Sequence, residues 1–80
     1  MTVRTTDAGE VALVGACPSE DAEPLLQALL EHPGAAVDLR GCDGAHTAVV
    51  QVLLAAQAPV RGPAAGAFLR QWVEPLLNAR

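Results

Sequence analysis

A helix with one continuous apolar face follows the N-terminal segment of the chain and needs another element to cover that face. Between residues 22 and 30, apolar side chains recur at spacings of three and four, which places them on one side of an α-helix. These side chains are Ala22, Leu25, Leu26, Leu29 and Leu30. Pro24 has no N–H to donate and belongs in the first turn, so Asp21 is the expected N-cap and His32 the expected end. We expect the leucines to be fully buried against a sheet.

Short stretches of β type lie on both sides of this helix. Val3–Thr5 and Glu10–Ala16 are separated by Asp7-Ala8-Gly9, whose residue types suit the turn of a hairpin. After the helix, Ala35–Leu39 is typical of a short buried strand, and Arg40–Gly44 is typical of a loop. The chain therefore begins with a predicted hairpin, and a third strand follows the helix.

Two further helices complete the pattern. The first begins near Ala45 or His46 and runs to about Gln57. It is apolar nearly all round, as expected of a helix that is largely buried or covered by a partner. Pro59–Arg61 is a very short candidate strand, and Pro75 should kink or divide the helix that comes last. This last helix carries an apolar stripe of Phe68, Leu69, Trp72, Val73, Leu76 and Leu77.

The order of these elements predicts the fold class. Strands that alternate with helices imply parallel neighbours in one sheet, here with an antiparallel hairpin at the start. The predicted fold is α/β: a small domain of order β-β-α-β-α-β-α, with a mixed four-stranded sheet packed by three helices. Eighty residues suffice for one hydrophobic core, so residues 1–80 form a single domain in this interpretation.

Composition excludes several classes of function. With 51% apolar and 18% charged residues, the chain is too apolar for a disordered tail. The net charge is −4 and the five arginines are isolated, which argues against nucleic-acid binding and against attraction to an anionic membrane. The polar N-terminus and the lack of a membrane-spanning apolar run predict a cytoplasmic protein.

The stretch from Val37 to Leu54 resembles the signature of STAS domains, the sulfate transporter and anti-sigma factor antagonist family. In that family, a strand ending in Asp-Leu leads through a loop to a segment such as Asp-Ser-Ser-Gly, which opens an apolar helix. Aligned on Asp38-Leu39, the phosphorylated position of the family falls on Thr47. His46 replaces the preceding Asp, and the Gly expected two residues after the acceptor is replaced as well. The element order also resembles the family, although the chain is shorter than most members.

The resemblance implies a regulatory domain that binds a protein partner and performs no catalysis. The implied partner is an anti-sigma factor or a histidine-kinase-like ATPase, released when Thr47 is phosphorylated. The implied contact residues are Asp38, Arg40, Cys42, Asp43, His46, Thr47 and Val50. An alternative is an accessory subunit on the ATPase of an ABC transporter, in which Thr47 is a contact residue and never a substrate.

Thr47 and His46 also carry arguments of their own. Thr47 lies in the first turn of its helix, where a phosphate adds about 1.5 to 2 negative charges beside free backbone N–H groups. The alternative is a threonine whose hydroxyl caps the helix. For His46 a capping role is the favoured interpretation, followed by partner contact, a pH-responsive switch or orientation of the Thr47 hydroxyl.

The two cysteines follow strands that run toward the same edge of the predicted sheet. Cys17 and Cys42 are therefore expected to approach each other, and in a reducing cytoplasm they should be free, partly buried thiols rather than a disulfide. Cys42 and His46 have a spacing that can bind zinc, but a structural site needs about four ligands and the remaining candidates, including His32, are distant. We expect no metal, and a thiol or metal sensor is the third hypothesis.

Catalytic signals are weak. The glycines lack the spacing of a phosphate-binding loop, and Ser19 has no evident base. We therefore expect neither an enzyme nor a cofactor. Phe68 and Trp72 share one helical face, for which core packing is the first interpretation. The alternative is an exposed anchor for a partner or for a second copy of the chain.

Overall fold

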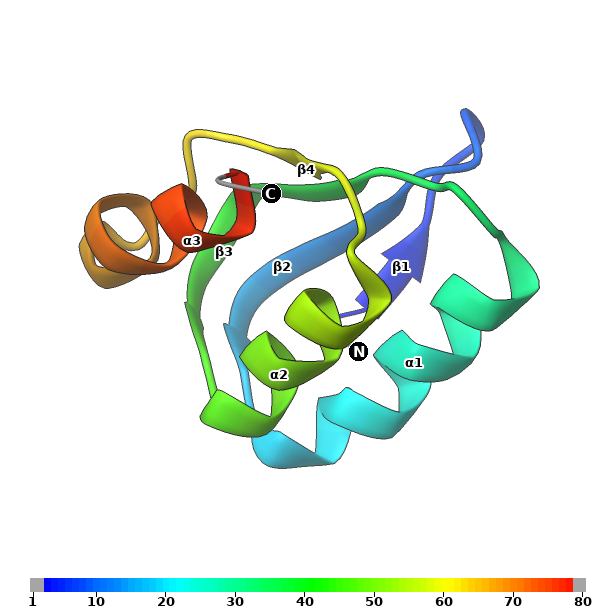
Figure 1. Cartoon of the computed structure of the whole chain (residues 1–80), viewed down its shortest axis with the longest axis horizontal. Coiled ribbons are helices and arrows are strands. Elements are labelled where there is room, and N and C mark those ends of the chain that lie inside the picture. Colours follow the sequence, from blue (N-terminus) through cyan, green and yellow to red (C-terminus); the bar gives the residue numbers. More distant parts are fainter. Residues whose placement is uncertain (1–2, 79–80) are drawn as a thin grey trace.

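One mixed sheet of four strands organises the computed structural model, which describes residues 3–78 (Figure 1). The strands stand in sequence order, so β1 and β4 are the edges. β1 is antiparallel to β2, whereas β2, β3 and β4 are parallel. Their bounds are β1 Val3–Thr5, β2 Val11–Cys17, β3 Val37–Ala45 and β4 Val60–Arg61.

The helices connect the parallel strands. α1 (Ala22–Glu31) and α2 (Thr47–Ala56) lie side by side on one face of the sheet (Figure 1). The last helix contains a π-helical turn, Leu69–Val73, which continues into α3 (Glu74–Asn78) and packs against β3 and β4. The expected small α/β domain with a mixed sheet and three helices is confirmed. The order contains two extra turns, this π-helical one and a 3-10 turn at Ser19–Asp21 before α1.

The core lies between the sheet and its helices. Alternate side chains of the strands point to this side, and α1, α2 and the last helix each add buried side chains. The buried apolar side chains are Val3, Val11, Leu13, Cys17, Leu25, Val37, Leu39, Cys42, Val49, Leu53, Ala58, Ala64, Leu69, Val73 and Leu77.

The predicted hairpin is present at the start of the chain. Thr6 N–H donates to the Glu10 carbonyl at 2.8 Å, and Gly9 N–H donates to the Thr6 carbonyl at 3.0 Å. Gly9 has φ +81°, a backbone conformation that glycine adopts without steric cost. The turn therefore forms at the predicted Asp7-Ala8-Gly9 segment.

The third strand is longer than the sequence pattern predicts. Arg40–Gly44 was expected to be a loop, but β3 runs from Val37 to Ala45 and pairs with β2 as far as Cys17. Nine residues of β3 stand beside seven residues of β2, and two register shifts absorb the difference. Because of the first shift, Cys42 rather than Gly41 takes the inward place after Leu39.

The expectation that α1 buries all its leucines is wrong. Leu25 is fully buried, but Leu26 and Leu30 are 44% and 66% exposed. The sheet covers only one side of a helix, so the outer part of the apolar stripe stays in solvent. Asp21 is the residue before α1 as expected, yet its side chain makes no capping hydrogen bond, because Asp21 already belongs to the 3-10 turn.

The last helix continues through Pro75 instead of dividing there. The irregularity lies directly before this proline, where Glu74 N–H donates to the Leu69 carbonyl with the wide spacing of a π-turn. Core packing of Phe68 and Trp72 is a wrong prediction: these side chains are 68% and 65% exposed. Their helix has two adjacent apolar stripes, and only the stripe of Leu69, Val73 and Leu77 faces the core.

A close backbone approach joins the last helix to β3. Gly66 N–H donates to the Cys42 carbonyl at 3.0 Å. A Cβ atom at Gly66 would lie 1.9 Å from the Asp43 carbonyl oxygen, so a side chain there requires the backbone to shift. Arg70 Nη1 further holds the preceding connection through the Ala64 carbonyl at 3.1 Å.

Gly66→Ala should therefore destabilise the protein. We expect its free energy of unfolding, from urea titration, to fall by about 1 to 3 kcal/mol because the added methyl group separates the last helix from β3. Gly44→Ala is the matched control, since a Cβ atom there meets nothing within 4 Å. Equal losses in the two variants would show that the Gly66 contact is unimportant.

Candidate functional site

The ends of β2 and β3 bring two helical segments together. β2 ends at Cys17 and leads into the 3-10 turn, and β3 ends at Ala45 just before α2. His46 N–H donates to the Cys17 carbonyl at 2.9 Å, which fixes the start of α2 beside the end of β2. The carboxyl ends of parallel strands are where ligands and partners most often bind in α/β sheets. We call this region, comprising Glu20, Asp43, His46 and Thr47, the strand-end site.

His46 caps α2, as the favoured interpretation predicted. Its backbone is extended, with φ −62° and ψ 152°, and its Nδ1 atom accepts a hydrogen bond from Ala48 N–H at 3.0 Å. The capping alternative for Thr47 is therefore wrong, since the preceding residue fills that role. Thr47 is the first residue of α2, and its side chain is exposed.

Negative charge dominates the strand-end site. Asp43 is exposed at the end of β3, and Glu20 lies on the 3-10 turn that contacts α2. Hydrogen bonds from the Glu20 backbone N–H and from the Ser19 hydroxyl, together with nearby His46, hold the pKa of Glu20 below its ordinary value. Glu20 therefore carries a full negative charge at neutral pH.

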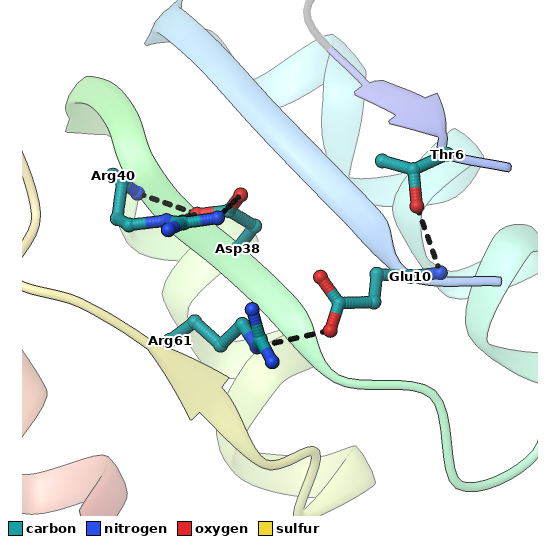
Figure 2. A network of polar contacts seen from close by, with 5 residues as sticks. All are labelled: Thr6, Glu10, Asp38, Arg40 and Arg61. Carbon is teal, nitrogen blue, oxygen red and sulfur yellow. Dashed lines mark hydrogen bonds and ion pairs between the residues drawn. The ribbon is translucent and has the colours of Figure 1, made fainter. Parts of the chain in front are cut away.

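Two of the predicted contact residues lie elsewhere. Asp38 and Arg40 point away from the helices, on the outer face of the sheet (Figure 2). Arg4, Ala12, Asp38 and Arg61 are cross-strand partners in a row over all four strands, and this surface is here called the open face. Sequence spacing puts Asp38 only five residues from Asp43, but the strand carries them to different parts of the molecule.

Ion pairs organise the open face. Asp38 accepts from the Arg40 side chain at 3.0 and 2.9 Å and from Arg40 N–H at 2.9 Å, while Arg61 contacts Glu10 at 2.9 Å (Figure 2). Hydrogen bonds from Arg40 hold the pKa of Asp38 below its ordinary value, and the same contact raises the pKa of Arg40. These charges thus pair within the sheet face rather than at the strand-end site.

Burial distinguishes Cys42, and in part Val50, from the exposed residues of the strand-end site. Cys42 is fully buried and Val50 is partly buried against the core, so the prediction that Cys42 touches a partner is wrong. The first register shift, between the Ala12–Asp38 and Val14–Gly41 pairs, turns the thiol inward. The thiols of Cys42 and Cys17 lie close together, with 3.9 Å between their Sγ atoms, and the two sulfurs are not bonded to each other.

Burial controls the chemistry of Cys42. Loss of solvent, followed by the nearby Cys17, raises the pKa of the Cys42 thiol to about 12. The group therefore stays protonated at neutral pH. Within residues 3–78, no three His, Cys, Asp or Glu side chains gather closely enough to hold a metal ion.

The last helix carries a second exposed feature, which the sequence predicted only as the alternative to core packing. Phe68, Trp72 and Leu76 stand one turn apart on the last helix and are 62–68% exposed; we call them the aromatic stripe. The hydrogen bond from Gly66 to Cys42 places the start of this helix beside the end of β3. The sequence signal for this exposure was the presence of two apolar stripes within residues 68–77, because one helix cannot turn both stripes toward the same core.

A groove opens at the other end of the helices. It has a volume of about 450 Å³ and lies between the C-terminal halves of α1 and α2. Leu26 and Leu30 from α1 and Ala55 and Ala56 from α2 provide much of its lining. The predicted burial of α2 is thus incomplete beside the groove, and Leu54 of the same helix is also 38% exposed.

No family model, curated protein or solved structure matches the chain significantly. Among the described helices, none combines the length and apolar character needed to cross a membrane. The strand-end site itself offers an exposed hydroxyl, a capping imidazole and two exposed carboxylates. Such a set can receive a phosphoryl group and can form polar contacts with a partner.

The Asp38–Arg40 pair should make stability depend on pH. Since the pKa of Asp38 is lowered by folding, its contribution exists above the unfolded pKa and disappears as pH falls through the folded pKa. We expect wild type to be slightly more stable than Asp38→Asn at neutral pH in urea titrations, with the difference vanishing once the pH lies below the lowered pKa of Asp38. In an Arg40→Gln background, Asp38→Asn should lose this pH dependence; an unchanged profile would contradict the assignment.

Proposed function

We propose that this chain is a non-enzymatic, STAS-like regulatory domain of the cytoplasm that binds a protein partner through the strand-end site. Phosphorylation of Thr47 would switch this binding. The observation that carries the proposal is the exposure of Thr47 as the first residue of α2, where β2 and β3 end. The mixed four-stranded sheet with its hairpin and crossover helices is compatible with that family.

The electrostatic surroundings give the switch a physical basis. A phosphate on Thr47 adds about 1.5 to 2 negative charges. Ala48 N–H already donates to His46 Nδ1, and Val49 and Val50 N–H donate to the His46 carbonyl, so it is the positive end of the helix dipole that favours an anion there. Modification therefore need not unfold the helix. Glu20 and Asp43 already make the site negative, so a partner must present basic or neutral groups to it. An interface that closes over the unmodified Thr47 provides neither space nor positive charge for a phosphate. Phosphorylation would therefore weaken partner binding.

The aromatic stripe supports a protein partner in particular. Phe68 and Trp72 are the only aromatic residues of the chain, and both are exposed. Exposed aromatic side chains in a group are typical of interaction surfaces, where tryptophan often provides a large share of the binding energy. The start of their helix contacts the end of β3, so one partner can reach both features.

Two partner classes follow from the family resemblance. An anti-sigma factor or histidine-kinase-like ATPase fits the phosphorylation switch, because such a partner also supplies the phosphoryl group. In the alternative, the ATPase of an ABC transporter, Thr47 is a permanent contact. Affinity capture with the wild-type chain from its native cell, followed by mass spectrometry of bait and prey, distinguishes them by the protein recovered and by the phosphorylation state of Thr47.

Thr47 should be the residue that a captured kinase modifies. After incubation with this kinase and ATP, we expect wild type to gain about 80 Da, the mass of one phosphoryl group, and Thr47→Ala to gain nothing. Thr5→Ala removes another exposed threonine, on β1, and should still be modified. Thr47→Asp should weaken capture of the partner by at least about tenfold. Modification of Thr47→Ala would contradict the proposed switch.

The aromatic stripe should matter for binding and little for folding. Trp72→Ser should reduce partner capture by about tenfold or more, because a central tryptophan is a frequent hot spot, while thermal stability changes little at a side chain 65% exposed. Leu30→Ser is the matched control, as Leu30 is equally exposed (66%) but lies on α1 beside the groove. Equal capture by wild type and Trp72→Ser would remove the stripe from the interface.

A further inference from the structure

Two buried thiols face each other directly before the strand-end site. Cys17 is the last residue of β2 and is 3% exposed, and Cys42 lies in β3 and is 0% exposed. Both side chains point to the helical side of the sheet, and their Sγ atoms are 3.9 Å apart. A disulfide has about 2.05 Å between its sulfur atoms, so rotation of the side chains must bring the atoms about 2 Å closer.

We propose that Cys17 and Cys42 form a reversible intramolecular disulfide, which makes this pair an oxidation site that fastens the end of β2 to β3. The geometry supports an intramolecular bond because burial keeps each thiol from the cysteines of other protein molecules, and the two thiols meet across adjacent strands. The register shift between the two strands places Cys42 on the inward face, where Cys17 already points. The proposal does not depend on partner binding or on Thr47.

The oxidation balances with a peroxide as the oxidant. The Cys17 sulfur, at the strand end, attacks one peroxide oxygen to give a sulfenic acid, and hydroxide leaves with the other oxygen. The Cys42 sulfur then attacks the sulfenic sulfur, and water leaves. In total, two thiols lose two electrons and two protons, and hydrogen peroxide becomes two molecules of water.

Burial determines the rate of this reaction. Desolvation keeps the Cys42 thiol protonated, with its pKa raised to about 12, so the second step is slow in the closed structure. Hydrogen bonding of Cys42 Sγ to the Gly44 carbonyl, at 3.4 Å, also holds the thiol in place. We therefore expect oxidation to take hours at low peroxide concentration, in contrast to the faster reaction of exposed reactive cysteines.

The disulfide should stabilise the fold. Its ring encloses the 3-10 turn and α1, which lie between the two cysteines. Cross-linking a segment of this length reduces the freedom of the unfolded chain, and we expect Tm to rise by roughly 10 °C. Dithiothreitol should return Tm to its starting value.

The test uses the whole chain, folded, with hydrogen peroxide as the only oxidant. We expect the intact monomer to lose about 2 Da, the mass of two thiol hydrogens, and both cysteines to become resistant to iodoacetamide. Trypsin cleaves after Arg40, which separates the cysteines into residues 5–40 and 41–61, so the disulfide should link these two peptides. This peptide map needs no variant and therefore holds even if a cysteine substitution prevents folding.

Variants provide the controls. Cys17→Ala and Cys42→Ala should show neither the loss of 2 Da nor the rise in Tm under the same treatment. Three results would overturn the proposal: two thiols that still react with iodoacetamide after long oxidation, covalent dimers in place of the monomeric product, or a disulfide that appears only when urea unfolds the chain. Failure of partner capture would leave these measurements unaffected, so the two proposals can be judged separately.

Discussion

The unequal pairing of β2 and β3 governs the rest of this molecule. Seven residues of β2 align with nine residues of β3, and each register shift gives β3 one extra residue. The shifts extend the strand through a glycine-containing segment and still return an apolar side chain, that of Cys42, to the core. Because α2 starts directly after β3, the same pairing determines where Thr47 emerges.

The sheet separates two chemical environments. Its inner face supplies the core beneath α1, α2 and the last helix, whereas its open face bears the Asp38–Arg40 and Arg61–Glu10 ion pairs (Figure 2). These pairs involve exposed arginines and add little to stability. They neutralise charge on that face, so the negative charge that Glu20 and Asp43 give the strand-end site is the more distinctive electrostatic feature.

Function in this interpretation arises where rigid elements end. His46 holds the first turn of α2, the Gly66 contact holds the start of the last helix, and the cysteine pair lies directly beneath both. The exposed Thr47 hydroxyl and the exposed aromatic side chains are thus held in place by these buried contacts, as a recognition surface requires. Oxidation of the thiols would fasten the end of β2 to β3 without altering the residues that face a partner.

Local sequence signals determined the hairpin turn, the succession of the strands and main helices, and the cap at His46, because each depends on residues within a few positions. They could not determine which of two apolar stripes on the last helix is buried, or that Arg40–Gly44 is a strand. Those outcomes depend on distant neighbours. A sheet covers only one side of each helix that packs on it. β2 supplies the hydrogen-bond partners that make the glycine-containing Arg40–Gly44 segment a strand.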